Sequence, residues 1–214
     1  MEHIAYLSSA YLAPVSYYYI LLHHDKVIIE QYDHYMKQTY RNRCHIAGPG
    51  GVLPLSIPVV RPDTPKCLMK DIQISDHGNW RHLHWNAIES AYNNTPFFDY
   101  YKDDFRPFYE KKYSFLIDFN EELRQLICEL IDFQPSTERS YEYKTAFNSN
   151  ECDLREAIHP KKDFELSNTG FIPHPYYQVF DNKHGFLPDL SIIDLLFNMG
   201  PESLLILNNK HKAN

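Results

Sequence analysis

Apolar and polar positions along the chain follow two periods, one typical of strands and one typical of helices. Residues 4–7 form a short apolar run typical of a buried strand, and residues 26–30 have a β-branched core that predicts a second strand. The segment between them has Pro14, a residue favoured in the first turn of a helix, and stays largely apolar to about His24. Strand, helix and strand in this order predict the beginning of an α/β layer.

A glycine-rich run, Gly48-Pro49-Gly50-Gly51, separates two further strand-like segments. Residues 39–46 and 52–59 flank this run and predict an antiparallel pair. We expect the second strand to be bent or at an edge, because Pro54 and Pro58 cannot donate backbone hydrogen bonds to a sheet.

Helical spacing dominates much of the remaining chain. Asn79 is a candidate cap for a helix that runs to Asn93, and Asp118 or Asn120 can cap a helix to about Ile131. The other expected elements are strands at 70–75 and 140–147, short helices at 97–109, a long polar loop at 148–175, an apolar helix at 190–199 that stops at Gly200-Pro201, and a short apolar segment at 203–207. These elements predict an α/β fold with a mixed β-sheet and packed helices, in a single domain over residues 1–207 with a disordered tail at 208–214.

Length and charge narrow the class of protein. A chain of 214 residues suits one sizeable core. Its net charge of −7 argues against a global nucleic-acid binder, which is usually basic. The sequence contains no stretch of about 18 purely apolar residues, which a membrane-spanning helix would need. The N-terminus also lacks the basic start of a signal peptide. We therefore expect a cytoplasmic protein without an integral membrane segment.

Cysteine and histidine spacing gives no metal motif. The four cysteines, at positions 44, 67, 128 and 152, form no Cys-x-x-Cys pair, and the histidines lack ligand spacing. Cys44 beside His45 is either an acyl-accepting nucleophile or a small core residue. Neighbouring side chains on a strand point to opposite faces, so His45 is not its natural base.

The segment Tyr40-Arg41-Asn42-Arg43 is the main candidate for binding an anion. Arg41 and Arg43 alternate, so on a strand they share one face and can hold a phosphate or carboxylate with their guanidinium forks. The nearby glycine run favours close approach of a ligand to the backbone. The alternative is that the arginines pair with Glu30 or Asp33. The glycine run does not match a P-loop.

The loop at Ser8–Pro14 is a second candidate site, because open α/β sheets bind ligands between the carboxyl end of a strand and the start of a helix. Ser9, Tyr11 and Tyr17 are the side chains expected to reach a ligand there. Ordinary packing of the tyrosines in the loop is the alternative.

The candidate catalytic residues are His84, Asp194 and Asn198. His84 falls on the apolar stripe of the helix at 79–93, where it is either a core histidine or a buried general base. Asp194 and Asn198, with Ser191, form a polar stripe on the apolar helix at 190–199. A buried carboxylate needs a partner, for which Arg41, Arg43 and a cationic ligand group such as a sugar amine are the candidates. The alternative is an internal structural network.

The succession of these segments resembles the WbqC-like family of bacterial proteins over residues 4–207. The resemblance rests on the following runs, of which the second and last are the most specific: Tyr11-Leu12-Ala13-Pro14; Tyr40-Arg41-Asn42-Arg43; Leu55-Ser56-Ile57-Pro58-Val59; Trp80 with His84-Trp85; Ser90-Ala91-Tyr92 with Pro96-Phe97-Phe98; and Phe186-Leu187-Pro188 leading into residues 190–202. Many members have His-Gln-Pro before Tyr-Leu-Pro, where this chain has Ser8, Ser9 and Ala10. The segment between about 140 and 180 is also short.

The resemblance implies a bacterial cytoplasmic protein of surface-polysaccharide (O-antigen) biosynthesis. It points to a transferase that attaches glycine or another acyl group to an amino sugar carried by a nucleotide or a lipid. No catalytic residues or cofactor follow from it. Two alternatives stay open: an adenylate-forming or nucleotidyl-transferring enzyme with its nucleotide at Ser8–Pro14, and a non-catalytic partner or scaffold in a glycan assembly complex.

Overall fold

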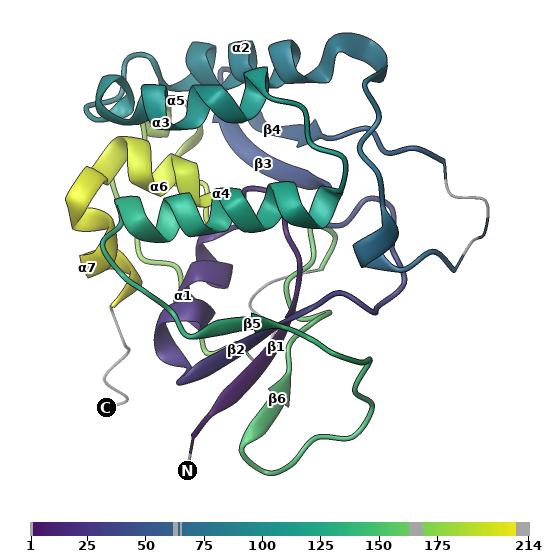
Figure 1. The fold of residues 1–214 in the computed structure, drawn as a ribbon. Coiled ribbons are helices and arrows are strands. Elements are labelled where there is room, and N and C mark those ends of the chain that lie inside the picture. The colour runs from purple at the N-terminus through teal and green to yellow at the C-terminus, as the bar shows by residue number, and fades with distance from the viewer. Residues whose placement is uncertain (1, 62–63, 65, 163–168, 209–214) are drawn as a thin grey trace, which may run out of the picture.

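Four short parallel strands form a sheet at one end of the molecule (Figure 1). The computed structural model describes residues 2–61, 64, 66–162 and 169–208. The strand order is β5 (Thr137–Arg139), β2 (Lys26–Glu30), β1 (Ile4–Ser8) and β6 (Glu151–Asp153). Because every neighbouring pair is parallel, the carboxyl ends of all four strands meet at one edge of the sheet.

Helix α1 (Val15–His23) connects β1 to β2, as the sequence predicts. The two strands pair in register from Ile4 with Lys26 to Ser8 with Glu30. Both are continuous apolar runs because a parallel sheet is normally covered on its faces. The predicted order of strand, helix and strand is therefore confirmed.

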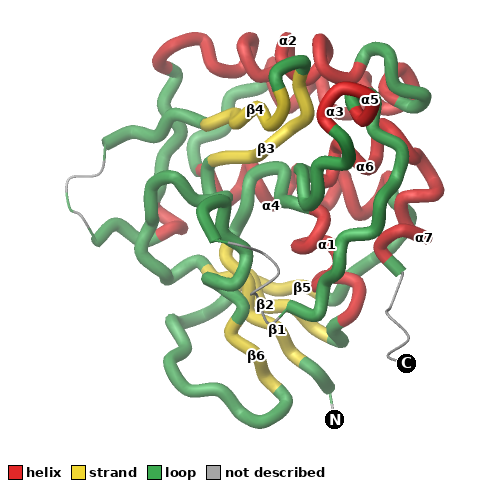
Figure 2. The backbone as a smooth tube through the Cα atoms, turned by 180° about the vertical axis from the view of Figure 1, so that it is seen from behind, coloured by secondary structure: helices red, strands yellow, loops and turns green. Residues whose placement is uncertain are grey.

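A separate antiparallel hairpin contains β3 (Arg43–Gly48) and β4 (Gly51–Ser56), and Figure 2 shows it above the parallel sheet. Gly51 has a φ of +104°, which a residue with a side chain rarely adopts, so glycine is needed at the turn. Pro54 is tolerated because β3 is the one strand with which β4 pairs among the described residues. The predicted pair is confirmed, but β3 starts at Arg43 instead of residue 39.

Helices cover the hairpin and the sheet. In Figure 1, α2 and α3 lie beside one another above the hairpin, and α4 crosses between the hairpin and the sheet. The helical elements are α2 (Trp80–Tyr92), α3 (Phe98–Glu110), α4 (Leu116–Leu130), α5 (Asp181–His184), α6 (Ile192–Met199) and α7 (Ser203–Leu207), with 3-10 turns at Met69–Asp71, His77–Asn79 and Gly200–Glu202. None of the described helices is long and apolar enough to cross a membrane.

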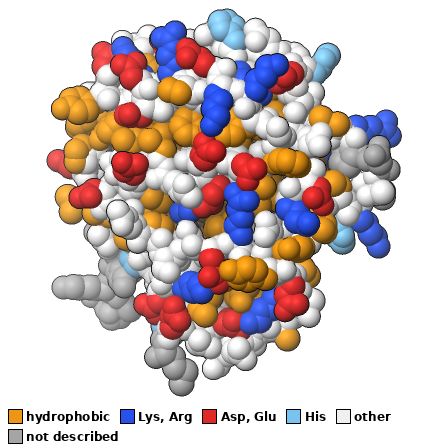
Figure 3. Space-filling view, viewed as in Figure 1, with side chains coloured by type: hydrophobic (Ala, Val, Ile, Leu, Met, Phe, Trp, Pro, Cys, Tyr) orange, Lys and Arg blue, Asp and Glu red, His pale blue; other side chains and the backbone are white. Residues whose placement is uncertain are grey.

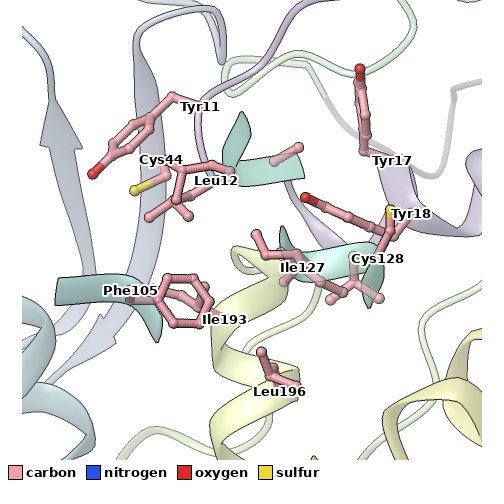
Figure 4. Packing of buried hydrophobic residues seen from close by; sticks show 14 of the residues in the cluster. Tyr11, Leu12, Tyr17, Tyr18, Cys44, Phe105, Ile127, Cys128, Ile193 and Leu196 are labelled. Atoms are coloured by element: carbon pink, nitrogen blue, oxygen red, sulfur yellow. The ribbon is translucent and has the colours of Figure 1, made fainter. Parts of the chain in front are cut away.

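The core is continuous between the hairpin and the helices. Figure 4 shows Leu12, from the loop after β1, packed near Cys44 of β3, while α6 contributes Ile193 and Leu196. Phe197 packs edge-on against Phe98 and Phe105 of α3, with ring centroids 5.2 and 5.4 Å apart. This apolar packing fixes α3 and α6 relative to the hairpin.

Three predicted elements differ from the structure. The helix for which Asp118 or Asn120 was the expected cap begins earlier, at Leu116. Asn120 lies inside this helix and donates hydrogen bonds to Ser9 Oγ and to the Arg41 carbonyl instead of capping it. Residues 70–75 form a 3-10 turn and two isolated bridges, not a strand. The strand predicted at 140–147 is absent among these described residues.

The short outer strands explain the last difference. Strand β5 ends at Arg139, and β6 lies inside the region predicted as loop. Each has three residues, too few to show a period, and each pairs with a longer apolar strand that offers its backbone. Of the predicted tail, residues 209–214 lie outside the described residues.

Candidate functional site

The carboxyl edge of the parallel sheet collects a group of buried charged residues. Arg41, in the turn before β3, is 3% exposed. Its guanidinium forms an ion pair with Asp33, donates to Ser8 Oγ at 2.8 Å and pairs with Glu156 Oε1 at 2.9 Å. Burial raises the pKa of the Asp33 carboxyl, and the Arg41 charge opposes that rise.

A second buried ion pair stands beside the first. Glu30, at the end of β2, is fully buried and receives hydrogen bonds from Ser140 Oγ at 2.6 Å and Arg155 Nη1 at 2.9 Å. Ser8 joins the two pairs, because its Oγ also donates to the Arg155 carbonyl at 3.0 Å. We call these residues the edge cluster: Ser8, Glu30, Asp33, Arg41, Ser140, Arg155 and Glu156.

The edge cluster changes the interpretation of the Arg-Asn-Arg segment. Arg41 has the alternative predicted partner, Asp33, and Arg43 lies half-exposed on β3, where its Nε donates to Ser56 Oγ at 2.9 Å. Asn42 donates to the Ile57 carbonyl at 2.8 Å. The prediction that Arg41 and Arg43 share a strand face is wrong, because Arg41 precedes the strand.

The glycine turn is also separated from Arg41. The turn follows β3, whereas Arg41 precedes it, so six strand residues, roughly 20 Å, lie between them. The Pro49 carbonyl at the turn faces α5, where it is bound by Lys183 and by His184 Nε2 at 3.1 Å. The expected joint anion site of arginines and glycines is therefore not assembled in this structure.

Two neighbouring cavities open beside the edge cluster. The smaller one, about 20 Å³, has room for about one water molecule. The larger one, about 140 Å³, lies against the N-terminus of α1, and we call it the edge cavity. Tyr40 and Ile158 line both. Of the residues predicted to bind a ligand, those that line the smaller cavity are Ser9, Tyr17, Tyr40 and Arg41.

Titratable side chains from three parts of the chain face the edge cavity. They are His45 of β3, His159 and Lys162 from the segment after β6, and Asp189 before α6. Burial and the charge of Arg43 lower the pKa of His45, and burial lowers the pKa of His159. Both imidazoles are therefore mostly neutral at pH 7 and able to accept a proton.

Asp189 occupies the N-terminus of α1. Its Oδ1 accepts from the Ser16 backbone N–H at 2.8 Å and its Oδ2 accepts from Ser16 Oγ at 2.9 Å. The Val15 N–H donates to the Leu190 carbonyl at 3.0 Å. Burial raises the Asp189 pKa to about 6, although hydrogen bonds from Ser16 oppose the rise. The donors expected to bind a nucleotide phosphate at this helix are thus already used by the protein.

His84 and Tyr11 belong to a different, closed network. Tyr11 and His84 are buried, and Tyr11 Oη lies 3.0 Å from His84 Nδ1 and 2.9 Å from Tyr109 Oη. The backbone of Ser56 favours the protonated His84 ring but does not offset burial. Burial lowers the His84 pKa to about 4, so the ring is neutral.

Asp194 has hydroxyl and amide partners instead of the expected cation. Its carboxylate receives hydrogen bonds from Tyr92 Oη at 3.0 Å, Tyr176 Oη at 2.7 Å and Gln178 Nε2 at 2.8 Å. Asn198 donates to the Asp194 backbone carbonyl at 2.7 Å. Neither Arg41 nor Arg43 is among these partners.

The three predicted catalytic residues thus lie in two separate networks. His84 is enclosed with tyrosines, whereas Asp194 and Asn198 fasten α6 to its surroundings. Their catalytic role stays a prediction, but the geometry brings none of them to the edge cavity. Cys44 is fully buried in the core near Tyr11 (Figure 4), and burial raises its thiol pKa, which favours the core reading.

Sequence reasoning missed most of the edge cavity. The sequence marks His45 only as a neighbour of Cys44 and gives no signal at Asp189 or His159. Glu30 does carry a signal, because a carboxylate at the carboxyl end of a buried parallel strand lies where such sheets bind ligands. The segment after β6 gives no such signal in the sequence, because β6 itself is not predicted.

Comparison with known proteins identifies the family. The model of the WbqC-like protein family matches residues 9–158 and 153–206. The uncharacterized protein Rv1507c of Mycobacterium tuberculosis is 27% identical over 223 residues, which cover 95% of this chain and 96% of that protein. No solved structure is matched by the chain. Because the family model covers most of its length, the chain belongs to the WbqC-like protein family.

Proposed function

We propose that this protein is a transferase that attaches an acyl or aminoacyl group, such as glycyl, to the amine of a sugar. The sugar is carried by a nucleotide or a lipid and belongs to the biosynthesis of a surface polysaccharide such as O-antigen. The pathway rests on the family resemblance. The chemistry rests on the edge cavity.

The supporting observation is a pair of neutral imidazoles in one small cavity. Acylation requires an unprotonated amine, and His45 and His159 each have a lowered pKa that favours the proton-accepting form. In the proposed step one imidazole removes a proton from the attacking ammonium group. The nitrogen then forms a bond to the acyl carbon. The bond from that carbon to its carrier breaks with its electron pair on the carrier, and the second proton of the nitrogen passes to the carrier, which leaves as its free thiol or phosphate.

The size of the edge cavity limits what it holds. Its volume of about 140 Å³ is well below the roughly 300–1,000 Å³ of a typical small-molecule pocket. An acyl group and the reacting amine suit this volume, while the nucleotide or lipid carrier lies outside it. The edge cluster supports the site, because Arg41 fastens the turn before β3 beside Tyr40, which lines the cavity.

Direct assay of acyl transfer tests the proposal. The purified full chain is incubated with coenzyme A thioesters, or with an amino acid and ATP, together with nucleotide-linked amino sugars, and mass spectrometry detects a new amide. Loss of the imidazole that acts as base, in His45→Asn or His159→Asn, lowers kcat by about 10²–10⁴-fold. The matched control is His77→Asn, which alters an exposed histidine that does not line the edge cavity.

Two results contradict the proposal. The first is the absence of both product and thermal stabilisation across the whole panel, which favours a non-catalytic partner of a glycan assembly complex. The second is full activity of both His45→Asn and His159→Asn, which places the chemistry elsewhere. Stabilisation by ATP alone, without binding of any sugar, supports an adenylate-forming enzyme instead.

A further inference from the structure

Two lysines beside the edge cavity bind neutral oxygens instead of carboxylates. Lys162 lines the cavity and is exposed, and its Nζ donates to the Glu156 backbone carbonyl at 3.0 Å. Lys161 precedes it, is also exposed, and donates to the side-chain amide oxygen of Gln38. Because a neutral oxygen does not cancel a charge, both ammonium groups keep their attraction for an anion.

Arg43 belongs to the same region through the strand face that it shares with His45. The two residues are two apart on β3, so their side chains point the same way, and His45 lines the edge cavity. The Arg43 guanidinium uses its Nε for Ser56 Oγ at 2.9 Å, and both Nη groups lack a partner among the described residues. Neither Nη is among the buried unpaired atoms, so both are accessible to a ligand. We call Arg43, Lys161 and Lys162 the cationic rim.

The charges of the cationic rim reach the two imidazoles of the cavity. Burial lowers the pKa of His45, and the Arg43 charge lowers it further. Burial also lowers the pKa of His159, and the charges of Lys162 and Lys161 act in the same direction. Such effects fade over about 10 Å in dilute salt, so the three cations lie close to the imidazoles.

The carboxylates of this region have partners of their own. Glu156 opposes the lysines at His159, but its Oε1 pairs with Arg41 at 2.9 Å. Asp189 lines the cavity, and both its oxygens accept from Ser16 at the N-terminus of α1, where the helix dipole offsets its charge. Within the described part of the chain, the cationic rim is therefore left without a counter-ion, in a protein whose net charge is −7.

Cations on the helical face are arranged differently. On α3, Lys102 pairs with Asp99 at 2.6 Å and Arg106 pairs with Glu110 at 2.8 Å. Figure 3 shows acidic and basic side chains interspersed over the face that carries the helices. The unpaired charge of the rim is thus a local feature of the surface beside the edge cavity.

We propose that the cationic rim binds the diphosphate group of the nucleotide or lipid carrier while the sugar's amine enters the edge cavity. A diphosphate ester carries more than one negative charge, which suits several unpaired cations better than a single carboxylate does. Its oxygens accept from the free Nη groups of Arg43 and from the two ammonium groups. The inference rests on the proposed function, because that function places the amine in the cavity. Diphosphate links sugars to nucleotides and to polyprenyl lipids alike, so one site serves either carrier.

Carrier binding is measured without any chemistry by isothermal titration calorimetry of the full chain. The probes are uridine diphosphate and geranyl diphosphate, each compared with its phosphate-free form, uridine or geraniol. We expect saturable binding of at least one diphosphate, no measurable binding of its phosphate-free form, and affinity that falls as salt is added. The diphosphate that binds more tightly identifies the carrier as a nucleotide or a lipid.

Variants of the rim test which side chains hold the diphosphate. The double variant Arg43→Met/Lys162→Met is expected to weaken binding at least about tenfold, because it removes two charge-assisted contacts. The matched control is Lys102→Met/Arg106→Met, which removes the same charge from α3, where no residue lines the edge cavity. Circular dichroism and thermal unfolding check that each variant is folded.

Three results overturn the inference. The first is a lack of binding of both diphosphates. The second is binding of the phosphate-free forms as tightly as the diphosphates, which means that the carrier is recognised elsewhere. The third is unchanged affinity in the folded Arg43→Met/Lys162→Met variant.

The two proposals fail in different experiments. Diphosphate binding that is lost in the rim variant, together with no amide product from any donor, supports the rim and contradicts acyl transfer. Amide formation from an uncharged amino sugar, with no binding of either diphosphate, supports acyl transfer and overturns the rim.

Discussion

Arg41 and Arg43 are only two residues apart and carry the same charge, but they differ in burial. Arg41 is 3% exposed and has two carboxylate partners, whereas Arg43 is half-exposed and donates to one hydroxyl. A buried ion pair contributes little net stability as a unit, but removal of one member leaves the other charge unpaired in the interior.

Arg41→Met is therefore expected to lower the free energy of unfolding by roughly 3–5 kcal/mol. Arg43→Met is the matched control, with an expected change of no more than about 1 kcal/mol. Urea unfolding of both variants measures the difference. Equal effects of the two substitutions would show that Asp33 finds other partners when Arg41 is removed.

The sequence predicts that Arg41 and Arg43 are important, but it does not predict which of them is buried. Arg41 and Arg43 share one strand face only if the strand extends to residue 39, and β3 begins at Arg43, where it pairs with Ser56 at the end of β4. The start of a strand depends on its partner's length, which local sequence does not contain. The prediction of Asp33 as a partner was confirmed because a turn brings the two residues together.

At the scale of elements, α6 is held at both ends by contacts that its sequence partly reveals. Its apolar run predicted the helix, and Gly200-Pro201 predicted its end. Gly200 has a φ of +54°, and a Cβ built there would lie 2.5 Å from the Phe97 ring. Glycine is therefore required both for the positive φ and for the close approach of the Phe97 ring. The sequence suggests only the first of these, because a glycine often ends a helix.

Gly200→Ala is expected to be strongly destabilising. The positive φ costs about 1–2 kcal/mol for a residue with a side chain, and the clash with Phe97 adds roughly 1–3 kcal/mol. Gly185→Ala provides a control with a φ of +69° and no atom within 4 Å of the added Cβ, so only the first cost applies. Thermal unfolding of the two variants should differ; similar melting temperatures would mean that Phe97 moves aside freely.

Asp194 makes the stability of α6 depend on pH. Burial raises its pKa from 3.8 to about 6, although hydrogen bonds from Tyr176, Gln178 and Tyr92 oppose the rise. The folded protein holds this proton more tightly than the unfolded chain does. The resulting stabilisation is complete below pH 3.8 and is lost as the pH rises through about 6.

We therefore expect the free energy of unfolding to fall between pH 4 and pH 7 by an amount on the order of 3 kcal/mol that is missing in Asp194→Asn. Tyr176→Phe removes a donor to the ionised carboxylate, which raises the Asp194 pKa further and extends the fall to higher pH. Urea unfolding at several pH values gives the three curves. A constant difference between wild type and Asp194→Asn would contradict the assignment.

At the scale of the whole molecule, the carboxyl edge of the sheet joins four distant parts of the chain. Ser8 ends β1 and Glu30 ends β2, whereas Arg41 precedes β3 and Arg155 follows β6. The sequence predicts the strands β1 and β2 and marks the loop after β1 as a candidate site. It did not predict Arg155, because β6 forms by pairing with β1, and pairing between residues 147 apart in the chain leaves no local pattern.

Because the charge of Glu30 adds to the effect of burial in raising the pKa of the neighbouring Asp33 carboxyl, the two ion pairs sense one another, and the edge cluster should respond to mutation as one unit. Arg41→Met and Arg155→Met are each destabilising, and we expect the double variant to deviate from their sum by about 0.5–3 kcal/mol, as residues of one network do. Arg41→Met combined with Tyr176→Phe serves as the control, since Tyr176 belongs to the Asp194 network and shares no hydrogen-bond partner with Arg41. That pair should add within about 0.5 kcal/mol. Additivity of both pairs would mean that the two ion pairs stabilise the edge separately, and that loss of Arg155 leaves Arg41 and the neighbouring wall of the edge cavity in place.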